Sequence, residues 1–232
     1  MSDPVLLQLG AGASGRPGPG YINCDMFPGP NIDCVFDAMK PWPFADDSVH
    51  GIYASHMLEH LPDAMFFFRE AYRVLEDRCL MRLRMPYGGH RSAWHDPTHL
   101  RPWYPESFAF LQPGYNEAVH NPQHNAWDAP FIVEHVGQRV GKQWARWLRW
   151  RMVKRYLLPV LDRIPDAVEE LWVALFPVKQ EGAQAYWRQE RPANLVPTSF
   201  LMYQHEWERK VWQEGMQFVL LDITGATPHR VA

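Results

Sequence analysis

The stretch Val5-Leu6-Leu7-Gln8-Leu9-Gly10-Ala11-Gly12 decides the fold. A short apolar run that stops at a glycine is typical of a buried strand, and glycine lets the next residues turn tightly and approach a ligand closely. Three similar runs follow, at residues 21–24, 32–36 and 49–54. Their nearly continuous apolar character predicts a mostly parallel sheet covered on both faces, and therefore an α/β fold.

The rest of the chain continues this alternation. Residues 63–76 carry apolar side chains at helical spacing, and Pro62 and Asp63 are residue types that suit the start of a helix. This pattern predicts a helix. Residues 87–114 are rich in proline, glycine, histidine and aromatic residues and predict an ordered loop with one short helix at Pro105–Leu111. Further strands are predicted at residues 79–85, 131–136 and 216–223.

A basic, tryptophan-rich segment precedes the last of these strands. Residues 139–189 predict a helical insertion, so that residues 1–138 and 190–232 would form one ligand-binding domain. From Arg139 to Arg155 there are seven Lys or Arg residues and no acid. This pattern fits a lid or self-association helix, or a helix that meets a membrane surface or an anionic partner, and the sequence leaves both open.

Composition sets the class of protein. The chain has 232 residues, 47% hydrophobic and 21% charged, which suits one globular domain with a sizeable core. A net charge of −3 gives no reason to expect nucleic acid as a partner. Cys24, Cys34 and Cys79 have no C-x-x-C spacing, and neither a signal peptide nor a bilayer-spanning run is visible, so we expect a cytoplasmic protein.

The glycine turn has the spacing of a dinucleotide fingerprint without its context. Gly10-Ala11-Gly12-Ala13-Ser14-Gly15 matches G-x-G-x-x-G, but residues 16–20 hold two prolines and two glycines where that site needs a helix. Asp25 and Asp37 close the next two predicted strands. Their carboxylates suit a ribose diol and an adenine edge, although aspartate also commonly ends strands as a turn residue. A cofactor without a pyrophosphate fits this arrangement better.

Several motifs, in order, resemble the class I S-adenosylmethionine-dependent methyltransferases, in particular the group with a short first loop. Leu7-Gln8-Leu9-Gly10-Ala11-Gly12 and Tyr21-Ile22-Asn23-Cys24-Asp25 are similar to the opening of that family. Further similar segments are Trp42-Pro43-Phe44-Ala45-Asp46-Asp47-Ser48-Val49, Ser55-His56-Met57-Leu58-Glu59-His60-Leu61 and Glu70-Ala71-Tyr72-Arg73-Val74-Leu75. The departures are His50-Gly51 and the glycine-free turn Glu76-Asp77-Arg78-Cys79.

The resemblance implies a Rossmann-like fold with a seven-stranded sheet, an antiparallel last strand, and S-adenosylmethionine as cofactor. Gly10 and Gly12 would pass under the methionine group, Asp25 would hold the ribose, Asp37 with Ala38 would meet the adenine, and His56 would lie near the sulfonium. The expected cofactor-binding residues are Gly10, Ala11, Gly12, Asp25, Met26, Asp37, Ala38, Ser55 and His56.

Histidines supply the remaining candidates. His95 and His99 lie in the loop after the fifth strand and, with His56, are the predicted catalytic residues, since histidine can take a proton from a methyl acceptor near neutral pH. Loop histidines can equally cap backbone carbonyls. No resident metal is predicted, although His95, Asp96 and His99 together, or the H-x-x-E-H pattern of His56, Glu59 and His60 in a zinc hydrolase, are alternatives.

The sequence thus predicts a methyltransferase that acts on oxygen, or less readily on nitrogen. Members of the resembled family with such a loop often act on sugars or small metabolites, so a hydroxyl of a glycan, glycoconjugate or small molecule is the expected acceptor. The alternative from another class is a non-catalytic relative that uses the tryptophan-rich segment for binding or assembly.

Overall fold

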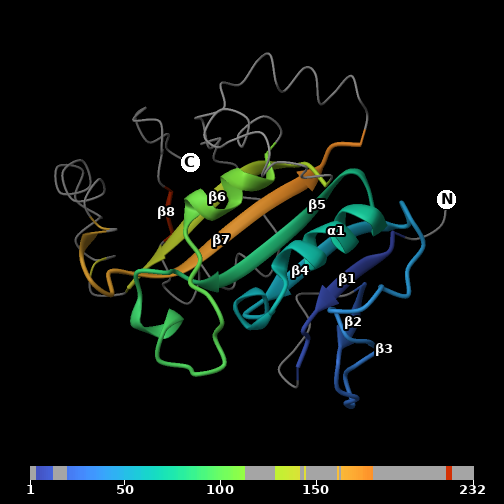
Figure 1. Ribbon diagram of the computed structural model, residues 1–232, viewed down its shortest axis with the longest axis horizontal. Helices are drawn as coiled ribbons and strands as arrows, with labels where there is room; N and C mark the ends of the chain where they lie inside the picture. Colours follow the sequence, from blue (N-terminus) through green and yellow to red (C-terminus); the bar gives the residue numbers. More distant parts are fainter. Residues whose placement is uncertain are drawn as a thin grey trace.

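A single mixed sheet organises the computed structural model, which describes residues 4–12, 20–112, 129–141, 144, 161, 163–179 and 218–220. Its eight strands lie in the order β3-β2-β1-β4-β5-β7-β6-β8 (Figure 1). In chain order they are β1 Leu6–Leu9, β2 Tyr21–Asp25, β3 Cys34–Val35, β4 Val49–Ser55, β5 Leu75–Pro86, β6 Phe131–Val140, β7 Val168–Pro177 and β8 Phe218–Leu220.

Strand direction confirms the predicted fold class. β3, β2, β1, β4 and β5 pair in parallel, whereas β7 is antiparallel to both β5 and β6, and β8 is antiparallel to β6. The sheet is therefore an open, mostly parallel, Rossmann-like sheet. It has one strand more than the seven expected.

The prediction of helix throughout residues 139–189 is wrong in two described segments, which are strands. Arg139 and Val140 complete β6, and Val168–Pro177 forms β7, the antiparallel strand between β5 and β6. Buried and part-exposed side chains largely alternate along β7, as they do in a strand with one face on the core. The antiparallel strand expected at residues 216–223 is present in part, as β8. The division into two domains stays a prediction, because most of residues 139–189 lie outside the described residues.

Helix α1, Ala64–Val74, confirms the helix predicted at residues 63–76. The Asp63 carboxylate accepts hydrogen bonds from the backbone N–H groups of Met65 and Phe66, each at 3.0 Å, and so caps the first turn. The helix ends at Val74 because Leu75 already begins β5, which is longer than the predicted strand at residues 79–85.

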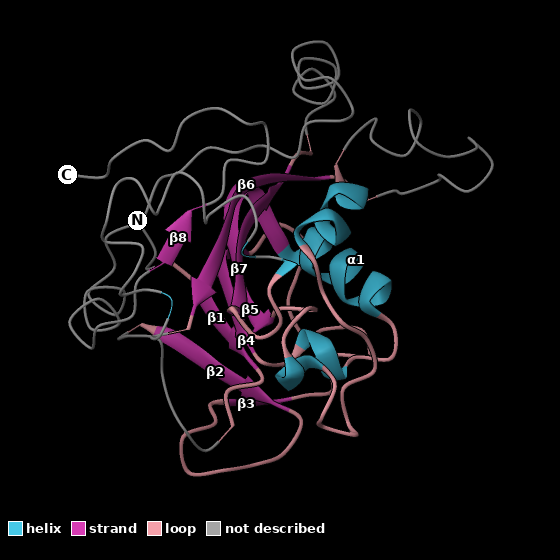
Figure 2. Cartoon of the chain, turned by 90° about the vertical axis from the view of Figure 1, so that its left-hand side faces the viewer, coloured by secondary structure: helices cyan, strands magenta, loops and turns pink. Residues whose placement is uncertain are grey.

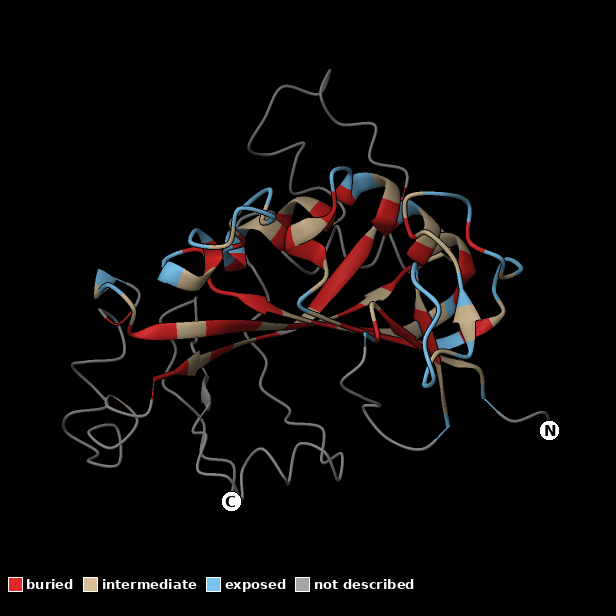
Figure 3. Cartoon of the chain, turned by 90° about the horizontal axis from the view of Figure 1, so that it is seen from below, coloured by how far each residue is buried: buried red, intermediate tan, exposed pale blue. Residues whose placement is uncertain are grey.

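The described helices lie on one face of the sheet (Figures 2 and 3). Besides α1 they are three short 3₁₀ helices: η1 Leu58–His60, η2 Arg91–Ala93 and η3 Pro105–Leu111. The core between these layers includes Leu7, Leu9, Ile52, Phe67, Phe68, Met81, Leu83 and Phe108, all at most 2% exposed. Among the described helices, none has the length and apolar character needed to cross a bilayer.

Candidate active site

The carboxyl ends of β1, β2, β3 and β4 bring the predicted cofactor residues to one edge of the sheet, where ligands of such folds bind. Gly10 and Gly12 follow β1 with φ of +63° and +55°, in the left-handed region that glycine tolerates. The Ala11 N–H donates to the Cys24 carbonyl at 3.0 Å, and the Gly12 N–H donates to Asp25 Oδ2 at 2.8 Å. The turn after β1 is thus fastened to the end of β2. Residues 13–19, with Gly15, lie outside the described part of the chain.

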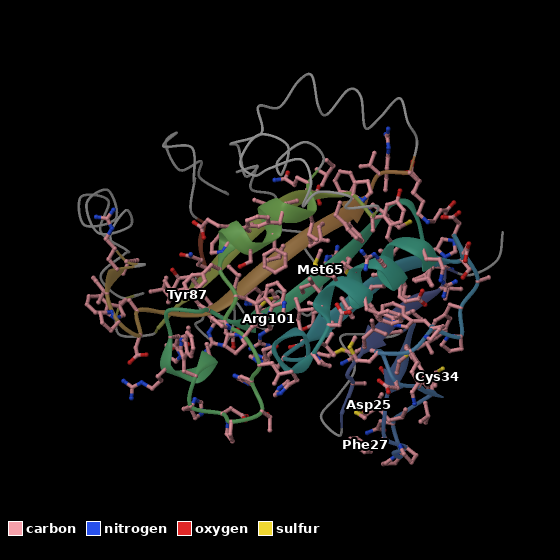
Figure 4. The ribbon with its side chains drawn as sticks, in the orientation of Figure 1. Asp25, Phe27, Cys34, Met65, Tyr87 and Arg101 are labelled. Carbon is pink, nitrogen blue, oxygen red and sulfur yellow. The ribbon has the colours of Figure 1, made fainter. Side chains whose placement is uncertain are left out.

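Asp25 has the acceptor capacity that a ribose diol requires. Its Oδ2 is used by Gly12, and its Oδ1 accepts a hydrogen bond from the Phe27 N–H at 3.0 Å. A carboxylate offers about four acceptor positions, so one on each oxygen remains for a hydroxyl group. Met26 and Phe27, the next two residues, are 56% and 68% exposed and give the edge an apolar surface suited to a flat base. Figure 4 labels Asp25 and Phe27. These residues fit an adenosyl group.

Asp37 shows the turn geometry that aspartate adopts at strand ends. Its Oδ1 accepts a hydrogen bond from the Met39 N–H at 2.9 Å, and its Oδ2 lies 3.7 Å from Lys40 Nζ. Ala38 is buried, and its carbonyl accepts the indole N–H of Trp42 at 3.1 Å. The turn function of Asp37 is therefore observed, and its contact with adenine stays a prediction.

His56 follows Ser55, the last residue of β4, and its ring lies between two carboxylates. Nδ1 is 3.3 Å from Glu59 Oε1, and Nε2 is 3.6 Å from Glu170 Oε1. The interaction with Glu170, and then that with Glu59, raises the pKa of His56 to about 9, against the opposing effect of burial. The ring is therefore protonated at neutral pH, and in this state it cannot accept a proton from a methyl acceptor.

Glu170 on β7 is the centre of a charge network that the sequence did not reveal. It accepts hydrogen bonds from Arg84 at 2.6 and 2.7 Å, from Arg139 at 2.7 Å and from the Trp172 indole at 3.2 Å. Burial alone would raise the pKa of Glu170, but the interactions with His56 and Arg84 hold it well below its usual range. The sequence analysis predicted helix where β7 lies, and it therefore did not place Glu170 beside His56.

The loop after β5 is fastened to the same edge of the sheet. Asp166, which precedes β7, accepts hydrogen bonds from the Arg91 backbone N–H and guanidinium at 2.5–2.7 Å. Farther along, the Leu100 N–H donates to the Glu59 carbonyl at 2.8 Å. Between these anchors Trp94 is 64% exposed and His95 is exposed. His95 Nδ1 lies 3.1 Å from the Arg91 carbonyl, which leaves Nε2 as the outward atom.

The zinc-hydrolase pattern does not form the helix that it requires. His60 belongs to η1, but His56 precedes the helix and has a positive φ of 51°. The two histidines are therefore not one turn apart on a helix. The alternative set His95, Asp96 and His99 is not brought together as a group of metal ligands in the described part of the chain.

One family model matches part of the chain. Residues 25–81, from Asp25 through α1 into β5, match a family model described as a methyltransferase domain. No curated protein matches the chain.

Solved structures with a similar fold include three proteins. One is a SAM-dependent methyltransferase from Archaeoglobus fulgidus, with 15% identity, a TM-score of 0.48, and coverage of 75% of this chain and 86% of that one. The YcgJ protein from Bacillus subtilis has 14% identity, a TM-score of 0.45, and coverage of 77% and 93%. An S-adenosylmethionine-dependent methyltransferase from Mesorhizobium loti has 14% identity, a TM-score of 0.43, and coverage of 74% and 90%.

The family match covers residues 25–81, so it begins at Asp25, the carboxylate predicted to hold the ribose. This part of the chain is therefore similar to a methyltransferase domain, and the strand order is that of an open Rossmann-like sheet.

Proposed function

We propose that the protein is a class I S-adenosylmethionine-dependent methyltransferase that methylates a hydroxyl group of a sugar, a glycoconjugate or another small metabolite. The observation that carries the proposal is the loop fastened by Arg91 and Leu100, which presents an exposed indole and an exposed imidazole at the cofactor edge. Sugars stack their apolar faces on aromatic rings, and Trp94 offers such a ring. An imidazole at the same place provides a base for the hydroxyl proton.

S-adenosylmethionine would be held by the Gly10–Gly12 turn and by Asp25, and when bound it supplies an activated methyl group. His95 would orient the acceptor hydroxyl and accept its proton at Nε2. His56 has a different role, because its charge is balanced by Glu59 and Glu170. We assign it to positioning at the end of β4. Alignment of acceptor and methyl group supplies most of the catalysis in such a site.

Cofactor affinity tests the first half of the proposal. Asp25→Ala removes the carboxylate that would bind the ribose, and hydrogen bonds to a charged group contribute about 1.5–3 kcal/mol. Titration calorimetry with S-adenosylhomocysteine should therefore show affinity at least ~10-fold weaker than for the parent protein. Glu76→Ala is the matched control, because Glu76 lies near the start of β5, at the opposite edge of the sheet. Equal affinity in all three proteins would refute the assignment of Asp25.

Methyl transfer tests the second half. Labelled S-adenosylmethionine is incubated with a panel of monosaccharides, glycoconjugates and small alcohols, and the labelled product is identified. His95→Ala should lower kcat on the accepted compound and leave the affinity for S-adenosylhomocysteine unchanged. A variant with unaltered kcat excludes His95 as the base, and binding without transfer to any hydroxyl compound overturns the proposed acceptor class.

A further inference from the structure

Three side chains at the carboxyl edge of the sheet come together from two separate segments. Glu59 and His60 belong to η1, and His99 belongs to the loop after β5. One ligand-type atom from each lies within 4.8 Å of the other two. The rings of His60 and His99 meet edge to face, with their centroids 4.7 Å apart. The Leu100 N–H, which donates to the Glu59 carbonyl, holds the two segments in this arrangement.

In the described part of the chain, Glu59 has a positive partner, His56, at only one of its two carboxylate oxygens. Its side chain is 2% exposed. Neither carboxylate oxygen has a hydrogen bond of good geometry from any described residue, and the one ion-pair contact, from His56, reaches only Oε1. A buried carboxylate with so few partners is costly unless a cation or hydrogen-bond donors compensate for the lost water. Oε2 is therefore available to a ligand.

Each of the two histidines has one ring nitrogen facing a protein oxygen, within hydrogen-bond distance for His60 and at ion-pair distance for His99, an arrangement common in metal ligands. His60 Nδ1 lies 3.3 Å from the Thr98 carbonyl and 3.0 Å from Thr98 Oγ1. His99 Nε2 lies 3.8 Å from Asp96 Oδ2, while its Nδ1 is buried without a hydrogen-bond partner among the described residues. A carbonyl or carboxylate on one nitrogen fixes the tautomer and leaves the other nitrogen free to coordinate.

We propose that Glu59, His60 and His99 bind a divalent transition-metal ion of the zinc type. The ligands would be a Glu59 oxygen, His60 Nε2 and His99 Nδ1, with Thr98 and Asp96 as the outer partners. Two imidazoles and one carboxylate are a ligand set that zinc accepts, with a fourth position left to water or another oxygen ligand. The ion would join the loop after β5 to the end of β4. The site stands independently of the methyl acceptor.

The sequence does not suggest this set. In the sequence, Glu59 and His60 form a metal-binding pattern only with His56, and His99 only with its neighbours His95 and Asp96. The pairing of η1 with the loop, which brings His99 to Glu59, is a tertiary contact between segments far apart in the chain.

Metal binding is tested directly on the full, tag-free chain. After EDTA treatment and desalting, the protein is titrated with ZnSO₄ by calorimetry, and bound zinc is measured by atomic emission after gel filtration. We expect one zinc per chain and a rise in Tm that grows with zinc concentration. His99→Asn and Glu59→Gln should each weaken binding at least ~10-fold.

Two controls make the result specific. His95→Ala removes an exposed histidine of the same loop and should bind zinc as tightly as the parent protein. Cys34→Ser tests whether a free thiol captures the metal. If Glu59→Gln fails to fold, Co²⁺ titration of the parent protein and of His99→Asn supplies the same answer, because tetrahedral Co²⁺ has an intense visible absorption. No bound zinc in the parent protein, or zinc retained by His99→Asn, overturns the site.

Discussion

Arg84 on β5 donates two hydrogen bonds to the Glu170 carboxylate on β7, from Nε at 2.7 Å and from Nη2 at 2.6 Å. This two-pronged pair joins the last parallel strand to the antiparallel strand beside it, at the edge where the active site lies. The same carboxylate is shared with Arg139 and approached by His56. One acid therefore contacts three basic groups, of which Arg139 also pairs with Glu169 and His56 also with Glu59.

Replacing Glu170 should destabilise the protein strongly. Both partners of the pair are mostly buried, and loss of one partner of a buried ion pair typically costs about 3–5 kcal/mol because the remaining charge is left uncompensated. We expect Glu170→Gln to lower the free energy of unfolding by that amount in urea denaturation. Arg91→Ala breaks the exposed pair with Asp166 and should cost far less, because water screens this pair. Equal losses in the two variants would contradict the burial argument.

The ion pair of Glu70 with Arg73 should make the stability of the folded protein depend on pH in the acid range. Glu70 accepts hydrogen bonds from Arg73 at 2.8 and 2.9 Å and from the Trp42 N–H at 2.6 Å. The Arg73 hydrogen bonds lower the pKa of Glu70, although burial opposes them. A pKa below the unfolded value of about 4.3 means that this stabilisation is complete above that pH and is lost as the pH falls through the folded pKa.

Glu70→Gln should therefore be less stable than the parent protein at pH 7 and nearly equal to it in strong acid. Urea unfolding at a series of pH values from 7 to about 3 measures the difference between the two curves. Glu76→Gln, at an exposed position on β5, should run parallel to the parent protein throughout. A constant gap between parent and Glu70→Gln would show that titration of Glu70 does not contribute to acid unfolding.

The cap of α1 gives a local test of the helix start. The Asp63 carboxylate satisfies two of the N–H groups that a helix leaves without partners in its first turn. Asp63→Ala should lower the free energy of unfolding by about 1 kcal/mol, whereas Asp63→Ser should restore most of it, because serine is also a good cap. Thermal unfolding followed by circular dichroism compares the three proteins. An alanine variant as stable as the parent would show that the cap is not used in solution.

The parts of the fold that the sequence predicted are those whose signal is local. β1, β2 and β4 are short apolar runs, and α1 has both helical periodicity and the cap Asp63. The order of these motifs also located the turn at Gly10 and the carboxylate of Asp25.

The parts that were missed depend on partners far away in the chain. Val168–Pro177 contains leucine, alanine and glutamate, which favour helices, yet pairing with β5 and β6 makes it a strand. The position of Glu170 beside His56 depends on the pairing of this strand, so the sequence alone did not indicate it. The group of Glu59, His60 and His99 likewise depends on the docking of a loop, which no periodicity reveals.

Two separate features of the turn after β1 favour glycine at position 10: the positive φ of the backbone and the small space beside Met57. Gly10 and Gly12 both have positive φ, but a Cβ added at Gly10 would lie 3.1 Å from Met57 Cβ, Cγ and Sδ, whereas one at Gly12 would meet no atom of the described residues within 4 Å. Left-handed backbone costs a non-glycine residue roughly 1–2 kcal/mol. Gly12→Ala should show only that cost, and Gly10→Ala should exceed it because Met57 must also move.

A double-mutant cycle distinguishes the two costs. Urea unfolding is measured for the parent, Gly10→Ala, Met57→Ala and the double variant. If the methyl group introduced by Gly10→Ala presses on Met57, the double variant will be more stable than the sum of the single losses predicts, by about 0.5–3 kcal/mol. Strict additivity would place the whole cost of Gly10→Ala in the backbone. Titration of the same four proteins with S-adenosylhomocysteine then shows whether the shape of this turn also sets cofactor affinity. If the cofactor lies close to the backbone at Gly10, both Gly10→Ala and the double variant should bind it more weakly than the parent protein.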